Sequence, residues 1–232
     1  MKRGMIGFFI IRSVFISLVI VWATTSGLRA QQRDPEPARF VDGSIPRPSP
    51  LAASAGDVVL SVAVSSSGAV GPIDVLRSTP PFTDDVLQAV KTWRFTPALD
   101  SKQKPMDTHV LVDAVFGAPS IMVPTVGTPP KDVTTADPRV PFPAQTNAPV
   151  YPVNARAEGS VLVEVLVGRA GRVTGATAVR SAPPFDAPAL QAARSWTFRP
   201  AAGADAMSPA YAYLLFVFRQ PVLGPVATPA KK

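Results

Sequence analysis

Hydrophobic and polar residues alternate along two stretches of this chain of 232 residues. In residues 58–64 every second position is valine or leucine, and in residues 161–167 every second position is valine. A period of two over seven residues is typical of a strand with one face in a core. Gly68 and Gly171 follow these stretches and suit the positive φ of a tight hairpin, which predicts a second strand after each.

The two stretches belong to an internal repeat. Residues 58–98 align with residues 161–201 at a constant offset of 103 without a gap, and 17 of the 41 positions are identical. Tryptophan, the rarest aromatic residue in the aligned parts, falls in step as Trp93 and Trp196. A repeat of this length is typical of a duplicated structural module.

Each repeat continues with a predicted helix and two further strands. Thr83 and Asp186 stand where a helix N-cap belongs, and an apolar stripe follows each of them. Aromatic residues at every second position then predict a short strand with its rings in the core; they are Trp93, Phe95, Trp196 and Phe198. The last strand alternates over residues 109–116, whereas residues 211–218 are apolar on both faces.

The N-terminal 30 residues predict export from the cytoplasm. They begin with Lys2 and Arg3, continue with an apolar run and end on Ala30, after which we expect cleavage of a secretory signal peptide. The alternative is an uncleaved inner-membrane anchor over residues 6–22, although Arg12 would lie within the span.

Composition narrows the function classes. The chain has no cysteine and a single histidine, His109, so thiolate sites and histidine clusters are excluded by count. We therefore expect no catalytic residues, no metal site, no cofactor and no enzyme activity. The net charge is +7, but four basic residues and no acidic residue lie in residues 1–30, which leaves 19 basic and 16 acidic residues. These are scattered, so nucleic acid is not expected as a partner.

A set of spaced residues resembles the C-terminal domain of TonB. The second repeat carries the opening Tyr151-Pro152, the pair Arg180-Ser181, the motif Trp196-x-Phe198-x-Pro200 and the terminal Phe218. The first repeat matches from Gly56 onward and lacks the Tyr-Pro opening. The resemblance implies an α+β fold of two tandem modules, each with an antiparallel three-stranded sheet and helices on one face, in the order αββαβ.

These observations divide the chain into six parts. They are a signal peptide or anchor (1–30), a short linker (31–44), the first module (45–117), a Pro-rich linker (118–147), the second module (148–220) and a tail (221–232).

The resemblance also implies how the chain binds its partners. Family members add a short segment of outer-membrane receptors to an open sheet edge, where backbone hydrogen bonds supply affinity. Four residues lie on the outward parity of the last strand, near that edge; they are Tyr211, Tyr213, Leu215 and Val217. Contact of these side chains with the other module or with a helix is the alternative.

Two functions follow as hypotheses. The first is a periplasmic adaptor that binds envelope proteins, outer-membrane receptors among them, by strand addition. The second is an inner-membrane-anchored energy transducer for transport through those receptors. Transducers of the family carry a Ser-x-x-x-His pair in the anchor, whereas here Ser13 and Ser17 are followed by no histidine. Inner-membrane association through residues 6–22 and homodimer formation both stay open.

Overall fold

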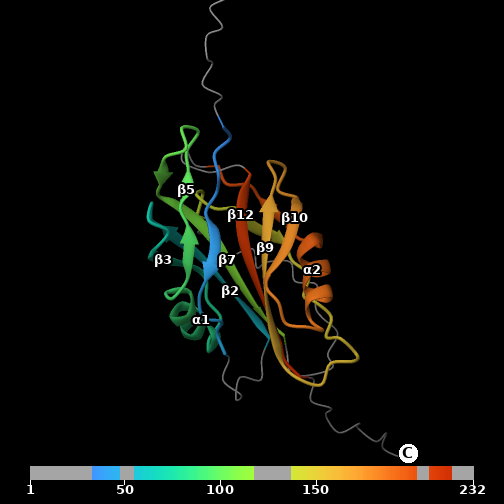
Figure 1. Cartoon of the computed structure of the whole chain (residues 1–232). Helices are drawn as coiled ribbons and strands as arrows, with labels where there is room; N and C mark the ends of the chain where they lie inside the picture. Colours follow the sequence, from blue (N-terminus) through green and yellow to red (C-terminus); the bar gives the residue numbers. More distant parts are fainter. Residues whose placement is uncertain (1–32, 48–54, 118–136, 203–208, 221–232) are drawn as a thin grey trace, which may run out of the picture. The chain divides into compact units, whose positions relative to one another are not determined.

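The structure is a computed structural model that describes residues 33–47, 55–117, 137–202 and 209–220 (Figure 1). Its strands and helices follow in chain order as β1 (Arg39–Asp42), β2 (Gly56–Val64), β3 (Val70–Arg77), α1 (Phe82–Val90), β4 (Arg94–Thr96), β5 (Ala98–Leu99), β6 (Pro105–Met106), β7 (Thr108–Phe116), β8 (Phe142–Gln145), β9 (Gly159–Val167), β10 (Val173–Arg180), α2 (Asp186–Ser195), β11 (Thr197–Arg199) and β12 (Ala210–Phe218).

The two repeats form one six-stranded sheet in the order β10-β9-β12-β7-β2-β3 (Figure 1). Each repeat contributes three antiparallel strands, and the repeats meet where β7 and β12 pair in parallel. The predicted α+β class is confirmed. The three strands of each repeat do not form a sheet of their own, because the last strands of the two repeats pair and join all six strands into one mixed sheet.

The composition of β12 explains why the sheets join. Residues 211–218 are apolar on both faces, as is usual for a strand that is covered on both sides. Burying both faces and both edges of β12 in the centre of a larger sheet satisfies its side chains and its backbone together.

The helices α1 and α2 cover opposite faces of this sheet. Val58, Leu60 and Val62 of β2 share a core with α1, whereas the alternate residue Val59 belongs to the core that contains α2. Because the equivalent strands β7 and β12 run parallel, the relation between the repeats is a two-fold rotation about the strand direction, which exchanges the faces. Each repeat has its one described helix on one face of its strands, and the two helices lie on opposite faces of the common sheet.

Both predicted hairpin glycines have the expected conformation. Gly68 has φ +80° and Gly171 has φ +74°, and a Cβ at either position would lie 1.9 Å from a backbone carbonyl oxygen, that of Phe95 or of Phe198. In the other direction, the carbonyl groups of Gly68 and Gly171 accept hydrogen bonds from the N–H groups of Phe95 and Phe198. Glycine is therefore needed both for its φ and for the close approach of the next strand.

A short strand before each predicted module pairs with the aromatic strand of that module. β1 pairs with β4, and β8 pairs with β11. The Nε1 groups of Trp93 and Trp196 donate hydrogen bonds to the carbonyl groups of Ser44 and Asn147, at 2.8 and 2.9 Å. The predicted linkers 31–44 and 118–147 each contain one of these short strands, β1 and β8.

The helix expected at the start of each repeat is absent from residues 148–158, which form turns. This segment contains Pro149 and Pro152, and its apolar Val153 is fully exposed, so a helix here would bury no apolar stripe. Tyr151 instead closes a loop by donating a hydrogen bond to the carbonyl group of Ala157. The equivalent segment of the first repeat falls largely on residues 48–54, outside the described residues.

Candidate partner-binding interface

The strand predicted to carry the binding surface lies inside the sheet. β12 pairs with β9 on one side and with β7 on the other, so it offers no open edge. Tyr213, Leu215 and Val217 are buried in the core that contains α1, and Tyr211 is half-buried beside it. The prediction that these four residues face a partner at a free edge is wrong. The alternative, contact with the other module, describes their positions.

The four aromatic residues proposed as the core signature are buried. Trp93 and Phe95 lie in the core with α1, and Trp196 and Phe198 lie in the core with α2. The ring of Phe40, on β1, completes the first cluster, with its centroid 5.0 Å from that of Trp93 and 6.3 Å from that of Tyr213. The first core therefore contains aromatic side chains of both repeats.

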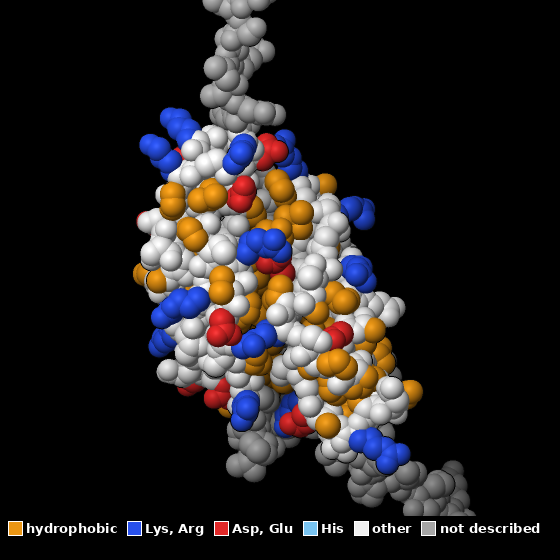
Figure 2. All heavy atoms as spheres, in the orientation of Figure 1, with side chains coloured by type: hydrophobic (Ala, Val, Ile, Leu, Met, Phe, Trp, Pro, Cys, Tyr) orange, Lys and Arg blue, Asp and Glu red, His pale blue; other side chains and the backbone are white. Residues whose placement is uncertain are grey.

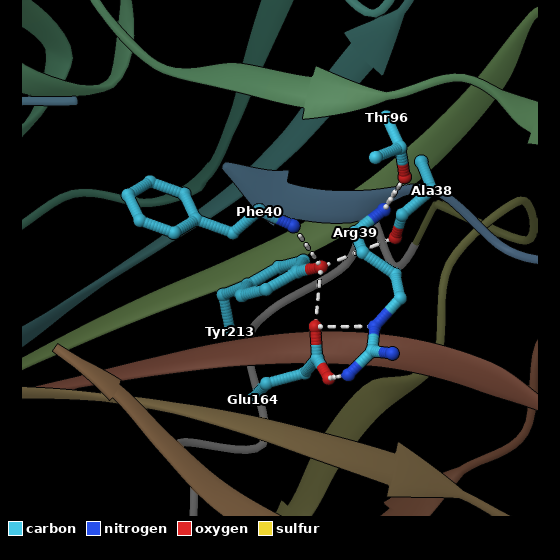
Figure 3. A network of polar contacts seen from close by, with 6 residues as sticks. All are labelled: Ala38, Arg39, Phe40, Thr96, Glu164 and Tyr213. Atoms are coloured by element: carbon cyan, nitrogen blue, oxygen red, sulfur yellow. Dashed lines mark hydrogen bonds and ion pairs between the residues drawn. The ribbon is translucent and has the colours of Figure 1, made fainter. Parts of the chain in front are cut away.

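A polar network ties β1 to the second repeat through the hydroxyl group of Tyr213 (Figure 3). This hydroxyl accepts a hydrogen bond from the N–H of Phe40 at 2.8 Å. Its own proton has two acceptors in reach, the carbonyl oxygen of Ala38 at 3.1 Å and Glu164 Oε2 at 3.2 Å. Burial and the neighbouring Glu164 raise the pKa of Tyr213 well above its usual value, so the hydroxyl keeps its proton.

Glu164 is a buried carboxylate in the middle of β9. Arg39 reaches it from β1, with Nη2 2.8 Å from Oε1, and the side chains point toward each other in Figure 3. The hydrogen bond to Glu164 and its negative charge raise the pKa of Arg39. Because Arg39 is itself more than half exposed and also stacks near the ring of Tyr211, this pair links the interior to the surface.

The opposite face carries an equivalent but chemically different contact. Ser61, which aligns with Glu164 at the offset of 103, donates a hydrogen bond to Asp137 at 2.5 Å. Asp137 is paired with Arg139, which also reaches Asp74 at 2.9 Å. Burial acts to raise the pKa of Asp137, but hydrogen bonds from Arg139 and Ser61 hold it at about 2. Each repeat thus sends its leading segment across to the other repeat.

Two strands of the six-stranded sheet keep an open edge among the described residues, namely β3 and β10 at its two ends. β3 contains Pro72, which lacks an N–H, and Asp74, which is paired with Arg139. β10 contains neither proline nor a charged residue between Val173 and Val179. Natural proteins protect exposed edges with proline and charge, so β3 is a protected edge and β10 is an unprotected one.

The polar groups between the repeats were not predicted from the sequence. Glu164 interrupts an otherwise apolar strand, and Asp113 does the same in β7. A charged residue on the alternation of a buried strand is a usable signal of a polar contact. Its partners were not predictable from spacing, because Arg39 lies 125 positions away.

Fold and interface together define a pair of related α+β modules that are joined through one sheet. Residues 46–117 and 147–215 match the family described as Gram-negative bacterial TonB protein C-terminal. These segments cover more than half of the chain, so the chain belongs to this family and is a TonB-like protein of the cell envelope. A search of curated proteins found no match.

The proposed export segment, residues 1–30, lies outside the described residues. Among the helices of the part that the structure describes, none has the length and apolar character needed to cross a membrane. The surface shown in Figure 2 carries basic and acidic side chains side by side over the described residues, with no face of one sign in that view.

Proposed function

We propose that this chain is a non-catalytic binding or adaptor protein of the periplasm that accepts an extended segment of an envelope protein as an added strand on the outer edge of β10. The observation that carries the proposal is the unprotected edge of β10, at the end of the sheet, together with the occupied edge of β12. An edge strand presents a row of unpaired N–H and C=O groups, which bind an extended peptide by strand addition.

The side chains of β10 support this role. Between Thr174 and Ala178 they are small, and several are exposed. Small side chains on an edge leave room for the side chains of an added strand to lie alongside, where cross-strand contacts provide selectivity. Arg180 is the last residue of β10, and its Nη2 lies 3.0 Å from Asp42 Oδ1. This ion pair marks the end of the open edge.

Family membership supports an envelope protein as the partner, with outer-membrane receptors as the first candidates. The anchored energy transducer is the weaker alternative, because it needs residues 6–22 as an anchor and the family's anchor histidine is missing from the sequence. The duplicated module fused through its last strands favours an adaptor, since the edge next to β12 is used for internal pairing.

Site-specific photo-crosslinking tests the proposal. A photoreactive residue replaces Thr177 on β10, or Asp74 on β3 as the matched control, and crosslinked envelope proteins are identified by peptide sequencing. We expect crosslinks to an extended segment of an envelope protein from position 177 and background levels from position 74. Equal crosslinking at both positions would contradict binding at β10.

Two proline variants test the role of the backbone. Successive residues of an antiparallel edge strand turn their N–H groups alternately inward and outward. Of Ala176→Pro and Thr177→Pro, one therefore removes an outward donor only, and circular dichroism identifies it as the variant with the wild-type melting curve. We expect this variant to lose the crosslinked partner. If it retains the partner, strand addition at β10 is wrong.

A further inference from the structure

A second buried carboxylate, Asp113, lies at the centre of the sheet without a hydrogen bond. Its side chain is fully buried, and neither carboxylate oxygen has a partner in the described part of the chain. Buried polar groups almost always have a partner, and an unpaired buried charge is strongly destabilising. The burial of Asp113 therefore lowers the stability of the fold.

The position of Asp113 is the junction of the two repeats. It is aligned with Leu214 of β12 on one side and with Val59 of β2 on the other. The equivalent position of the second repeat, at an offset of 102 in the last strand, is Leu215, which is fully buried. The first repeat thus carries a carboxylate where the second carries an apolar side chain that fits the core.

The charged groups that face Asp113 do not neutralise it. Asp57 of β2 adds a like charge, and Arg77 of β3 forms its ion pair with Asp57. Two guanidinium nitrogens of Arg77, Nε and Nη2, are also buried without a partner.

The charges that act on Asp113 are those of Asp57 and Arg77. The other elements packed against this face present mainly apolar side chains, and the guanidinium group of Arg199 lies over the ring of Phe142. β12 presents Ala212, Leu214 and Phe216, and the leading segment of the second repeat presents Val140 and Phe142. The charges of that segment, Asp137 and Arg139, are paired with each other.

We propose that the parallel junction of β7 and β12 is a latch controlled by the charge on Asp113: it is closed when the carboxyl group is neutral and opens when the group ionises. Opening at this junction brings Asp113 to water. This opening keeps the nine residue pairs that join β7 to β2, and it separates only the six residue pairs that join β7 to β12. An open latch would expose the edges of both last strands, in addition to the edge of β10.

The direction of the pH effect follows from the surroundings of Asp113. Burial, reinforced by Asp57 and partly offset by Arg77, raises the pKa of Asp113 well above its usual value. The closed state therefore binds a proton that the open state releases. The latch is firmly closed below the ordinary pKa of an aspartate and weakens as the pH rises toward the raised value, opposite to the usual acid loosening of carboxylate-rich proteins.

Hydrogen–deuterium exchange of the full chain tests the latch. Wild type, Asp113→Asn and Asp113→Leu are compared at pH 5 and pH 8, always at the same pH so that intrinsic exchange cancels. We expect amides of β7 and β12 to exchange at least about tenfold faster in the wild type than in either variant at pH 8, since each unit of pKa shift is worth a factor of ten. This ratio should shrink at pH 5. Asp113→Leu introduces the residue that the second repeat has at the equivalent position. It serves as the folded variant if Asp113→Asn destabilises the core.

Exchange in β2 and β9 and the exposed-carboxylate variant Asp84→Asn are the controls. The strands β2 and β9 should keep wild-type protection, and Asp84→Asn should behave as the wild type. Two results would overturn the latch. One is equal exchange of wild type and both Asp113 variants in β7 and β12 at pH 8. The other is a pH-dependent acceleration of the same size in β2 and β9, which would report global unfolding. Both results are independent of any partner at β10.

Discussion

The hydroxyl group of Tyr213 joins three parts of the chain that are far apart in sequence. It accepts a hydrogen bond from the N–H of Phe40 and lies within hydrogen-bond distance of Ala38 and Glu164. One oxygen atom therefore connects the leading strand β1 to the second repeat. Buried networks of this kind are costly when one member is removed, because the remaining groups lose their partners.

Tyr213→Phe isolates that effect. The ring keeps its packing, while the N–H of Phe40 loses its acceptor and Glu164 loses a donor. We expect a loss of about 1–3 kcal/mol in the free energy of unfolding, which lowers Tm by roughly 2–10 °C in a domain of this size. Thermal unfolding followed by circular dichroism measures it.

Tyr211→Phe is the matched control on the same strand. Tyr211 is half-buried, and its hydroxyl forms no hydrogen bond with another described residue, so we expect a change within about 0.5 kcal/mol. A Tyr213→Phe variant as stable as Tyr211→Phe would show that the network contributes nothing measurable to the fold.

Among the elements, the two hairpins β2–β3 and β9–β10 have the strictest local requirement. Gly171→Ala places a methyl group 1.9 Å from the carbonyl oxygen of Phe198 at φ +74°. We expect it to cost at least about 2 kcal/mol, because steric displacement adds to the strain of the left-handed conformation. Gly175→Ala, three residues into β10, meets nothing closer than Leu166 Cβ at 3.7 Å and should be nearly neutral. Urea unfolding compares the two, and similar midpoints would contradict the argument.

Elements were predictable from sequence where their signal is local. The alternation in residues 58–64 and 161–167 identified β2 and β9, and the spaced tryptophan and phenylalanine residues identified β4 and β11. The strands β1 and β8 have four residues each and lie in proline-containing stretches, so they form only because their partners exist. Pairing energy of this kind depends on contacts that sequence periodicity does not encode.

The site was harder to predict than the elements, because it depends on how the repeats meet. The apolar character of residues 211–218 on both faces was visible in the sequence and is typical of an interior strand, but the family resemblance led to the prediction of an edge. Neither the parallel pairing with β7 nor the resulting change of open edge to β10 follows from either repeat taken alone.

As a whole, residues 33–220 carry two cores that are each built from both repeats. Leu162, Tyr213 and Leu215 of the second repeat complete the core around α1, and Val59 and Leu111 of the first complete the core around α2. Neither repeat can therefore unfold without exposing apolar surface of the other, which couples them into one cooperative unit under conditions that keep the latch closed.

This coupling predicts that a destabilising substitution in one repeat lowers the stability of the other repeat by the same amount. In a Trp22→Phe, Trp196→Phe background the only remaining indole is Trp93, in the core around α1. Adding Gly171→Ala, in the second repeat, should lower the urea midpoint of Trp93 fluorescence at pH 5 by the same amount as the midpoint of the far-ultraviolet signal. The reason is that β9 and β12 cannot leave the sheet while the core around α1 stays closed. A Trp93 midpoint that stays in place while the far-ultraviolet signal splits into two transitions would mean that the repeats are independent domains in contact, and the shared cores would then be a minor part of the stability.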